Sequence, residues 1–198
     1  MMKLFDTWDI SGIKVQDEGL RDYINLKQVL VPRSSGRSVK VRFHKSSNYS
    51  IVERLMNKLM VVGHRGKKHK YTSGHNTGKS IKIYNITFEA LKLVEERTKK
   101  NPVEVLVKAI ENAAPREEIT TIEYGGARYP KSVECSPQRR VDLVLRNMTQ
   151  GSYAASFAKK KKSYQALAEE IIHAYNSNSN SVAISKKLEL ERQADSAR

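Results

Sequence analysis

The sequence of 198 residues contains a single cysteine, Cys135. One cysteine excludes an internal disulfide framework and a cysteine-based metal site, and it suits a reducing compartment such as the cytoplasm. Long apolar runs are also lacking, because no stretch approaches the roughly 20 residues that a membrane-spanning helix needs. Residues 1–9 are too short and too acidic to form a signal peptide. These features predict a protein without a membrane partner.

Acidic residues are scarce in one block of the chain. Residues 33–82 contain thirteen lysines and arginines but one acid, Glu53, in a chain whose net charge is +15. Residues 1–32 and 83–136 are close to neutral, and residues 137–198 carry a smaller basic excess of five charges. Positive charge this uneven indicates a polyanionic partner, of which nucleic acid is the commonest.

Metal-binding and nucleotide-binding patterns are incomplete. The run Gly78-Lys79-Ser80 resembles the end of a phosphate-binding loop, but only three residues separate it from Gly74, where the motif needs four. Three histidines occur nearby: His64, His69 and His75. No acidic residue or cysteine lies close to them in the sequence to complete a metal site, and the surrounding basic residues would repel a divalent cation. We therefore expect no metal site and no nucleotide hydrolysis.

Catalytic pairs are not recognisable either. Glu117 and Glu118 are adjacent, so in a strand they point to opposite faces and cannot act as an acid–base pair. We predict a non-enzymatic protein without a cofactor or a small-molecule substrate. An architectural DNA-binding protein is an alternative with the same charge, although it would usually need a dimer interface or a recognition helix, and neither is evident.

Apolar residues recur at helical spacing through most of the chain. A capping box or a cap followed by proline marks three helix starts: Ser50 with Glu53, Asn101-Pro102 and Ser136-Pro137. Glycine or proline marks three predicted ends: Gly63, Pro115 and Gly151. The predicted helices cover about residues 50–62, 81–100, 102–114, 137–150, 152–175 and 182–198.

A Gly125-Gly126 pair separates two β-prone runs, residues 119–124 and 127–135. A two-residue primed turn needs positive φ angles, which glycine adopts without steric cost, so this pattern predicts a β-hairpin. An isolated two-stranded hairpin is only marginally stable in water. We expect the helix that begins at Ser136-Pro137, and the helix pair around Asn101, to hold its base.

Three basic segments are candidate contacts for RNA phosphates. Residues 33–48 have few apolar anchors and form either a solvated linker or an arm that orders on RNA, with these contacts: Arg33, Arg37, Lys40, Arg42 and Lys45. The glycine-rich loop at residues 63–80 adds Lys70. Residues 159–162 are four consecutive lysines, which would spread around a helix, so that some are simply solvated; Lys159 and Lys160 are the candidates.

The order and wording of these segments resemble the family of ribosomal protein seven of the small subunit, in its archaeal and eukaryotic form. The similarity covers nearly the whole chain and rests on these runs: SIVERLMNKL (50–59), GKK (66–68), NPVEVLVKAIENAAPRE (101–117), YGGARYP (124–130), SPQRRV (136–141) and KKLELER (186–192).

The resemblance implies a structural protein in the head of the small ribosomal subunit, in the cytoplasmic ribosome. Members bind the 3′ major domain of the small-subunit ribosomal RNA directly and nucleate head assembly. They lie near the exit-site transfer RNA, the emerging messenger RNA and neighbouring ribosomal proteins of the head and platform. By position, the RNA contacts would include Gly66, Lys67, Lys68, Arg139, Arg140 and Arg146. The hairpin tip near the exit site would consist of Tyr124, Gly125, Gly126, Arg128 and Tyr129.

The expected fold is mainly α. It is a bundle of about six helices with a protruding two-stranded β-hairpin at about residues 118–135. Residues 1–48 would form an N-terminal extension with the basic arm, and residues 49–198 a helical RNA-binding domain. Tyr124 and Tyr129 have two open interpretations: their rings stack on RNA bases, or they brace the hairpin against the bundle.

Overall fold

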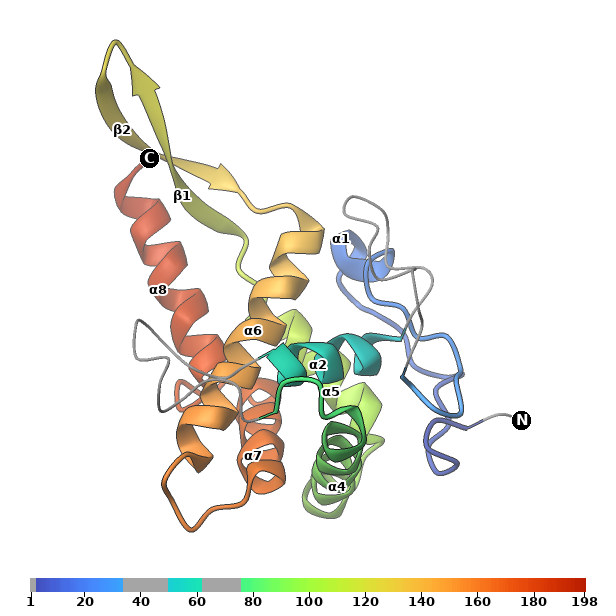
Figure 1. Ribbon diagram of the computed structural model, residues 1–198. Coiled ribbons are helices and arrows are strands. Elements are labelled where there is room, and N and C mark those ends of the chain that lie inside the picture. Colours follow the sequence, from blue (N-terminus) through green and yellow to red (C-terminus); the bar gives the residue numbers. More distant parts are fainter. Residues whose placement is uncertain (1–2, 34–49, 62–75) are drawn as a thin grey trace.

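The computed structural model describes residues 3–33, 50–61 and 76–198. In these residues the chain forms seven helices and one antiparallel hairpin (Figure 1), which confirms the predicted mainly α fold. The helices are α1 (Glu18–Arg21), α2 (Ile51–Val61), α4 (Ser80–Thr98), α5 (Pro102–Ala113), α6 (Pro137–Ser156), α7 (Ser163–Tyr175) and α8 (Val182–Ser196). The strands are β1 (Glu117–Tyr124) and β2 (Ala127–Glu134).

Helix α5 lies at the centre of the core. Its start follows the predicted signal, because the Asn101 side chain accepts a hydrogen bond from the Val103 amide at 3.0 Å and Pro102 occupies the first turn. Its apolar residues at helical spacing are buried, namely Val103, Leu106, Val107 and Ile110, and so are Val105 and Ala109 on another side. A helix that is apolar on most sides is enclosed by other helices, and α7 packs against both α4 and α5.

Helix α6 does not end at Gly151, so that prediction is wrong. The helix runs on to Ser156, and residues 157–162 form a turn before α7 begins at Ser163. The predicted helix over 152–175 is therefore wrong in its first part, and the four lysines lie in a turn. Gly151 is buried where α6 passes close to the start of α8: a Cβ atom there would lie 2.9 Å from Cβ of Val182.

The segment formed by residues 3–33 packs against the helical core. Phe5 and Trp8 are buried and form aromatic contacts with Phe88 of α4, with ring centroids 5.5 Å apart in both pairs. The Trp8 indole N–H donates a hydrogen bond to Glu95 Oε2 at 2.9 Å. The boundary between an extension and a helical domain stays a prediction, because residues 34–49 lie outside the described part of the chain.

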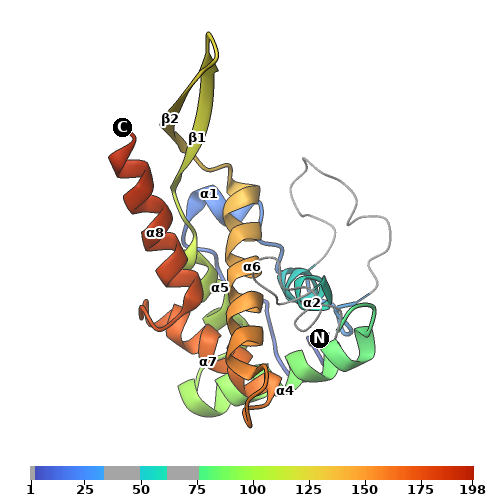
Figure 2. The same ribbon diagram turned by 60° about the vertical axis from the view of Figure 1, so that its left-hand side comes forward.

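The hairpin projects beyond the helices, as both views show (Figures 1 and 2). α6 leads away from its base, and the turn at residues 157–162 lies at the opposite end of that helix. At 1.5 Å per residue, the twenty residues of α6 span roughly 30 Å. The molecule thus presents a hairpin at one end and a lysine-rich turn at the other.

Candidate nucleic-acid interface

The hairpin has the turn that its sequence predicts. Tyr124 pairs with Ala127 across the turn, and Gly125 and Gly126 have φ angles of +55° and +84°. Positive φ at both central residues defines the primed turn that matches the twist of the strands. Residues 120–131 are exposed on both strands.

The two faces of the hairpin differ in chemistry. Because side chains alternate along a strand, Ile122 and Tyr124 share one face with Tyr129, which pairs with Ile122. Tyr124 and Tyr129 are 76% and 59% exposed, so neither braces the hairpin against the bundle. The opposite face carries Glu123 and Arg128, whose charged groups are 3.6 Å apart.

Sequence reasoning missed Ile122 and Lys131 as members of the tyrosine face. The signal was available: once the Gly125-Gly126 turn fixes the pairing, alternation places Ile122 beside Tyr124, and Lys131 beside Tyr129. Beyond the base of the hairpin this face carries a cation and no acid.

Three arginines of α6 were predicted to contact RNA, and the structure separates them. Arg146 is exposed on the outer surface of α6. Arg139 is 52% exposed, and its guanidinium group meets the Glu118 carboxylate through two nitrogen atoms, at 2.5 and 2.6 Å. Arg140 is only 12% exposed, and it links α6 to other parts of the fold.

The Arg140 guanidinium donates to Asp17 Oδ2 at 2.9 Å and to the Pro115 carbonyl oxygen at 3.1 Å. It therefore joins the N-terminal segment, the end of α5 and the start of α6. This geometry gives Arg140 a structural role and lends no support to a direct RNA contact, which stays a prediction for this residue.

The turn at residues 157–162 contains the other described cations of the prediction. Lys159 and Lys160 are exposed, and no ion pair is found for either within the described residues. Glu169 of α7 pairs with Lys161, and also with Arg97 of α4 at 3.8 Å. Arg97 thus lies beside the lysine turn, a neighbour that sequence reasoning missed because more than sixty residues separate the two.

Of the remaining predicted contacts, only Arg33 lies within the described residues. It is exposed at the end of the N-terminal segment. The others lie outside the described residues: Arg37, Lys40, Arg42, Lys45, Gly66, Lys67, Lys68 and Lys70. The histidines His64, His69 and His75 also lie outside them.

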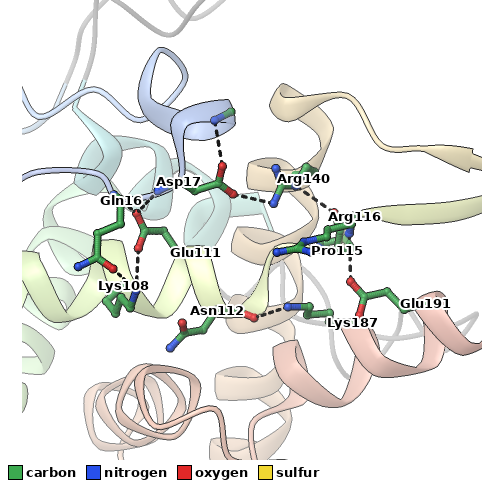
Figure 3. A network of polar contacts seen from close by, with 11 residues as sticks. Gln16, Asp17, Lys108, Glu111, Asn112, Pro115, Arg116, Arg140, Lys187 and Glu191 are labelled. Carbon is green, nitrogen blue, oxygen red and sulfur yellow. Dashed lines mark hydrogen bonds and ion pairs between the residues drawn. The ribbon is translucent and has the colours of Figure 1, made fainter.

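A cleft of about 760 Å³ lies between α5, the start of α6 and the hairpin base. Several of its charged side chains pair with neighbours, as Figure 3 shows: Glu111 accepts from the backbone amide of Gln16 at 2.6 Å and pairs with Lys108, while Asp17 pairs with Arg140. Carboxylates engaged in this way hold the surrounding segments together. They do not form the matched acid and base that catalysis needs.

The Cys135 thiol borders the same cleft. Burial raises its pKa to about 11, and the nearby Glu118 carboxylate acts in the same direction. A thiol with this pKa stays protonated near neutral pH and is a poor nucleophile. Within the described residues, no group of three or more potential ligands could hold a metal ion. In the same part of the chain, no helix is long and apolar enough to cross a membrane.

The fold and surface therefore define a helical binding protein, with a projecting hairpin and exposed cations but without catalytic machinery in the described residues. The model of the family "Ribosomal protein S7p/S5e" matches residues 20–198. The chain belongs to this family: it is a structural constituent of the small ribosomal subunit and not an enzyme. The predicted resemblance is confirmed, and family membership replaces the alternative of a DNA-binding protein.

Curated relatives agree over the whole length. A protein of Nanoarchaeum equitans named small ribosomal subunit protein uS7 is 58% identical over 197 residues, covering 100% of this chain and 99% of its own. Proteins of the same name from Methanosphaera stadtmanae and Archaeoglobus fulgidus are 48% and 46% identical over 195 residues. They cover 98% of this chain, and 98% and 94% of their own lengths. These relatives are archaeal, as the predicted archaeal-type character requires.

Proposed function

We propose that this chain binds the 3′ major domain of the small-subunit ribosomal RNA and nucleates assembly of the subunit head. Its hairpin lies near the exit-site transfer RNA and the messenger RNA, and neighbouring head and platform proteins pack around it. The observation that carries the proposal is the separation of two exposed surfaces: cations on the helical body, and on the hairpin an aromatic face that carries no acid beyond its base.

The helical body supplies phosphate contacts. Arg146 on α6 and Lys159 and Lys160 in the turn are exposed, and the basic residues 33–82 add most of the charge. Lysine and arginine side chains that neutralise phosphates release counterions, so the affinity depends strongly on salt. Folded RNA is recognised largely by shape and by unpaired elements, which a rigid helical surface can match.

The hairpin supplies a different kind of contact. From Glu117 to Glu134 the hairpin contains two basic and four acidic side chains, so its net charge of −2 does not attract phosphates. The exposed rings of Tyr124 and Tyr129 are suited to stacking on unpaired bases. The hairpin therefore reaches toward bound transfer RNA or messenger RNA while the helical body holds the ribosomal RNA.

The test is a salt titration of the full chain with an RNA fragment of the head domain. Replacing Arg146, Lys159 and Lys160 by glutamine should weaken binding and reduce the slope of log affinity against log salt by roughly one unit for each phosphate that is no longer neutralised. The matched control is Lys186→Gln, because Lys186 already pairs with Glu189 on α8. Unchanged affinity and slope in the triple variant would reject these residues as contacts.

Arginines 139 and 140 need separate variants. Replacing both by alanine is expected to weaken RNA binding, but the loss of Arg140 also breaks its bonds to Asp17 and Pro115. Only Arg139→Ala tests the RNA contact without removing that link.

A further inference from the structure

We propose that Glu117 and Glu118 are positioning residues that clamp the hairpin base between α8 and α6, and so fix the direction in which the hairpin leaves the helical body. The importance of a fixed direction rests on the proposed function, since only a hairpin that meets a partner needs one. The clamp itself stands on the contacts of these two carboxylates.

The two carboxylates act on opposite faces because they are neighbours on one strand. Glu118 meets Arg139 in the first turn of α6, with Oε1 2.5 Å from Nε and Oε2 2.6 Å from Nη2. Two parallel bonds from one guanidinium group restrict orientation as well as distance. This contact fixes one face of β1 against α6.

The other face of the base is held by the end of α8. Arg198 donates to both carboxylate oxygens of Glu117, at 2.7 and 2.8 Å, and Ser132 of β2 donates its hydroxyl to the same carboxylate at 3.1 Å. These donors lower the pKa of Glu117. The Ser132 amide also donates to the carbonyl oxygen of Ala197 at 3.3 Å. Both strands of the hairpin are thus tied to one helix end.

Helix α8 is itself tied to the helical body near the hairpin (Figure 3). Lys187 donates to the carbonyl oxygen of Asn112 at the end of α5, at 2.8 Å. One turn further along α8, Glu191 accepts from the backbone amide of Arg116, just before β1, at 3.1 Å. The helix therefore connects the core to the hairpin base. The sequence had suggested two anchors for the base, the helix that begins at Ser136-Pro137 and the helix pair around Asn101. The first contributes through Arg139 of α6, and α8, which was not predicted for this role, packs against both β1 and β2.

The clamp matters because the rest of the hairpin is exposed. Residues 120–131 lie in solvent on both faces, so the direction of the strands is set at their base. A strand of eight residues is about 25 Å long, and a rotation of about 10° at its base would move the tip by about 4 Å. Such a shift exceeds the tolerance of a hydrogen bond or a stacked pair of rings.

The test measures the direction of the hairpin in the full chain without RNA. In a Cys135→Ser background, spin labels on Ala127→Cys at the tip and Ala154→Cys on the exposed surface of α6 report one distance distribution by pulsed electron resonance. With the clamp intact this distribution should be narrow. Arg198→Glu should broaden it and shift its mean by at most the displacement of the tip, which is about 4 Å for a rotation of about 10° at the base.

The matched control is Arg192→Glu, which makes the same charge change at an exposed position on α8 and should leave the distribution unchanged. The charge swap Glu117→Arg with Arg198→Glu should restore part of the narrowing. Glu118→Gln should broaden the distribution independently, because it acts on the opposite face.

The melting temperature of the helical body should stay within the range of the control, since a positioning role changes the hairpin and not the core. If Arg198→Glu and Glu118→Gln both give the parent distribution, or if broadening comes only with loss of the helical fold, the clamp is wrong. Either result leaves RNA binding untouched, so it is distinguishable from failure of the proposed function.

Discussion

At the scale of single residues, Glu170 shows how a charged side chain can serve the core. It lies on α7 and is buried, and its carboxylate accepts from the Ser181 hydroxyl at 2.9 Å and from the Ala183 amide at 3.1 Å. It therefore caps the first turn of α8, where the helix dipole favours negative charge. Burial nevertheless raises the pKa of this carboxyl group above its usual value of 4.5.

We predict that Glu170→Ala costs about 1–3 kcal/mol, because it leaves buried donors without an acceptor. Glu170→Gln should retain a hydrogen-bond acceptor and remove the pH dependence that this carboxyl group gives to the stability of the fold. A carboxyl group whose pKa is raised by folding stabilises the fold at pH values below 4.5, and this contribution is lost as pH rises through the folded-state pKa. Urea unfolding of the native chain and of Glu170→Gln between pH 4 and 8 measures the difference.

The control for this pH dependence is Glu189→Gln. The pKa of Glu189 is lowered by Lys186, so its contribution has the opposite sign and is lost as pH falls. His173, whose charge lowers the Glu170 pKa, is common to all these variants. If the free energies of unfolding of the native chain and of Glu170→Gln changed with pH in parallel, folding would not change the pKa of Glu170.

The arginine pair on α6 shows where sequence reasoning ends at this scale. Arg139 and Arg140 are identical in type and adjacent, so no local pattern distinguishes them. Their roles differ because successive helical residues point about 100° apart: one meets Glu118 at the surface and the other is enclosed beside Asp17. Only the packing of segments far apart in sequence assigns each its partner.

At the scale of elements, local signals predicted what depends on local structure. The Gly125-Gly126 turn and the Asn101-Pro102 start were correct because their hydrogen bonds and φ angles lie within a few residues. The prediction at Gly151 was wrong because glycine occurs in helices for two reasons. It often marks the end of a helix, and it also occurs where another segment packs too closely for a side chain. Here it lets two helices approach closely, and the reason lies about thirty residues away at Val182.

We predict that Gly151→Ala destabilises the junction of α6, α7 and α8. Alanine is normally favoured over glycine inside a helix by about 1 kcal/mol. At this position the new Cβ would lie 2.9 Å from Cβ of Val182 and 3.1 Å from Cδ of Glu170, and the backbone would have to move. Overpacking of this kind costs typically about 1–3 kcal/mol and outweighs the gain in helix propensity.

Chemical denaturation measures this change, with Gln150→Ala on the neighbouring, half-buried position as the control. A substitution away from such a close contact should stay within about 0.5 kcal/mol. If Gly151→Ala increased the stability, α8 would be able to move away from α6 without a loss of packing energy, and the prediction would be wrong.

At the scale of the whole molecule, the sequence predicted the helical fold and the hairpin but not how the N-terminal segment joins them. Residues 3–33 have no clean periodicity, because they form turns and short contacts rather than one regular helix face. Their side chains still enter the core at Leu4, Trp8 and Leu20. The amide of Ile51 at the start of α2 donates to the carbonyl oxygen of Asn25, which links this segment to the bundle.

The division between body and hairpin leads to a prediction for the whole particle. Replacing Tyr124 and Tyr129 by serine should leave folding and affinity for the head-domain RNA unchanged, because the rings are exposed and the cations lie elsewhere. Retention of transfer RNA at the exit site of reconstituted small subunits should fall, since removing an aromatic ring that stacks on a base costs about 1–3 kcal/mol. Filter binding with both RNAs measures the two effects separately.

The opposite face supplies the matched control for that experiment. Glu123→Gln removes the acidic partner of an exposed ion pair, which contributes about 0–1 kcal/mol, and leaves Arg128 and both tyrosines in place. If Glu123→Gln lowered exit-site retention as much as the double tyrosine variant does, the tyrosine face would have no special role in holding transfer RNA. A severe loss of head-domain affinity in the tyrosine variant alone would instead make the hairpin an assembly contact, because its exposed aromatic face would then be holding ribosomal RNA.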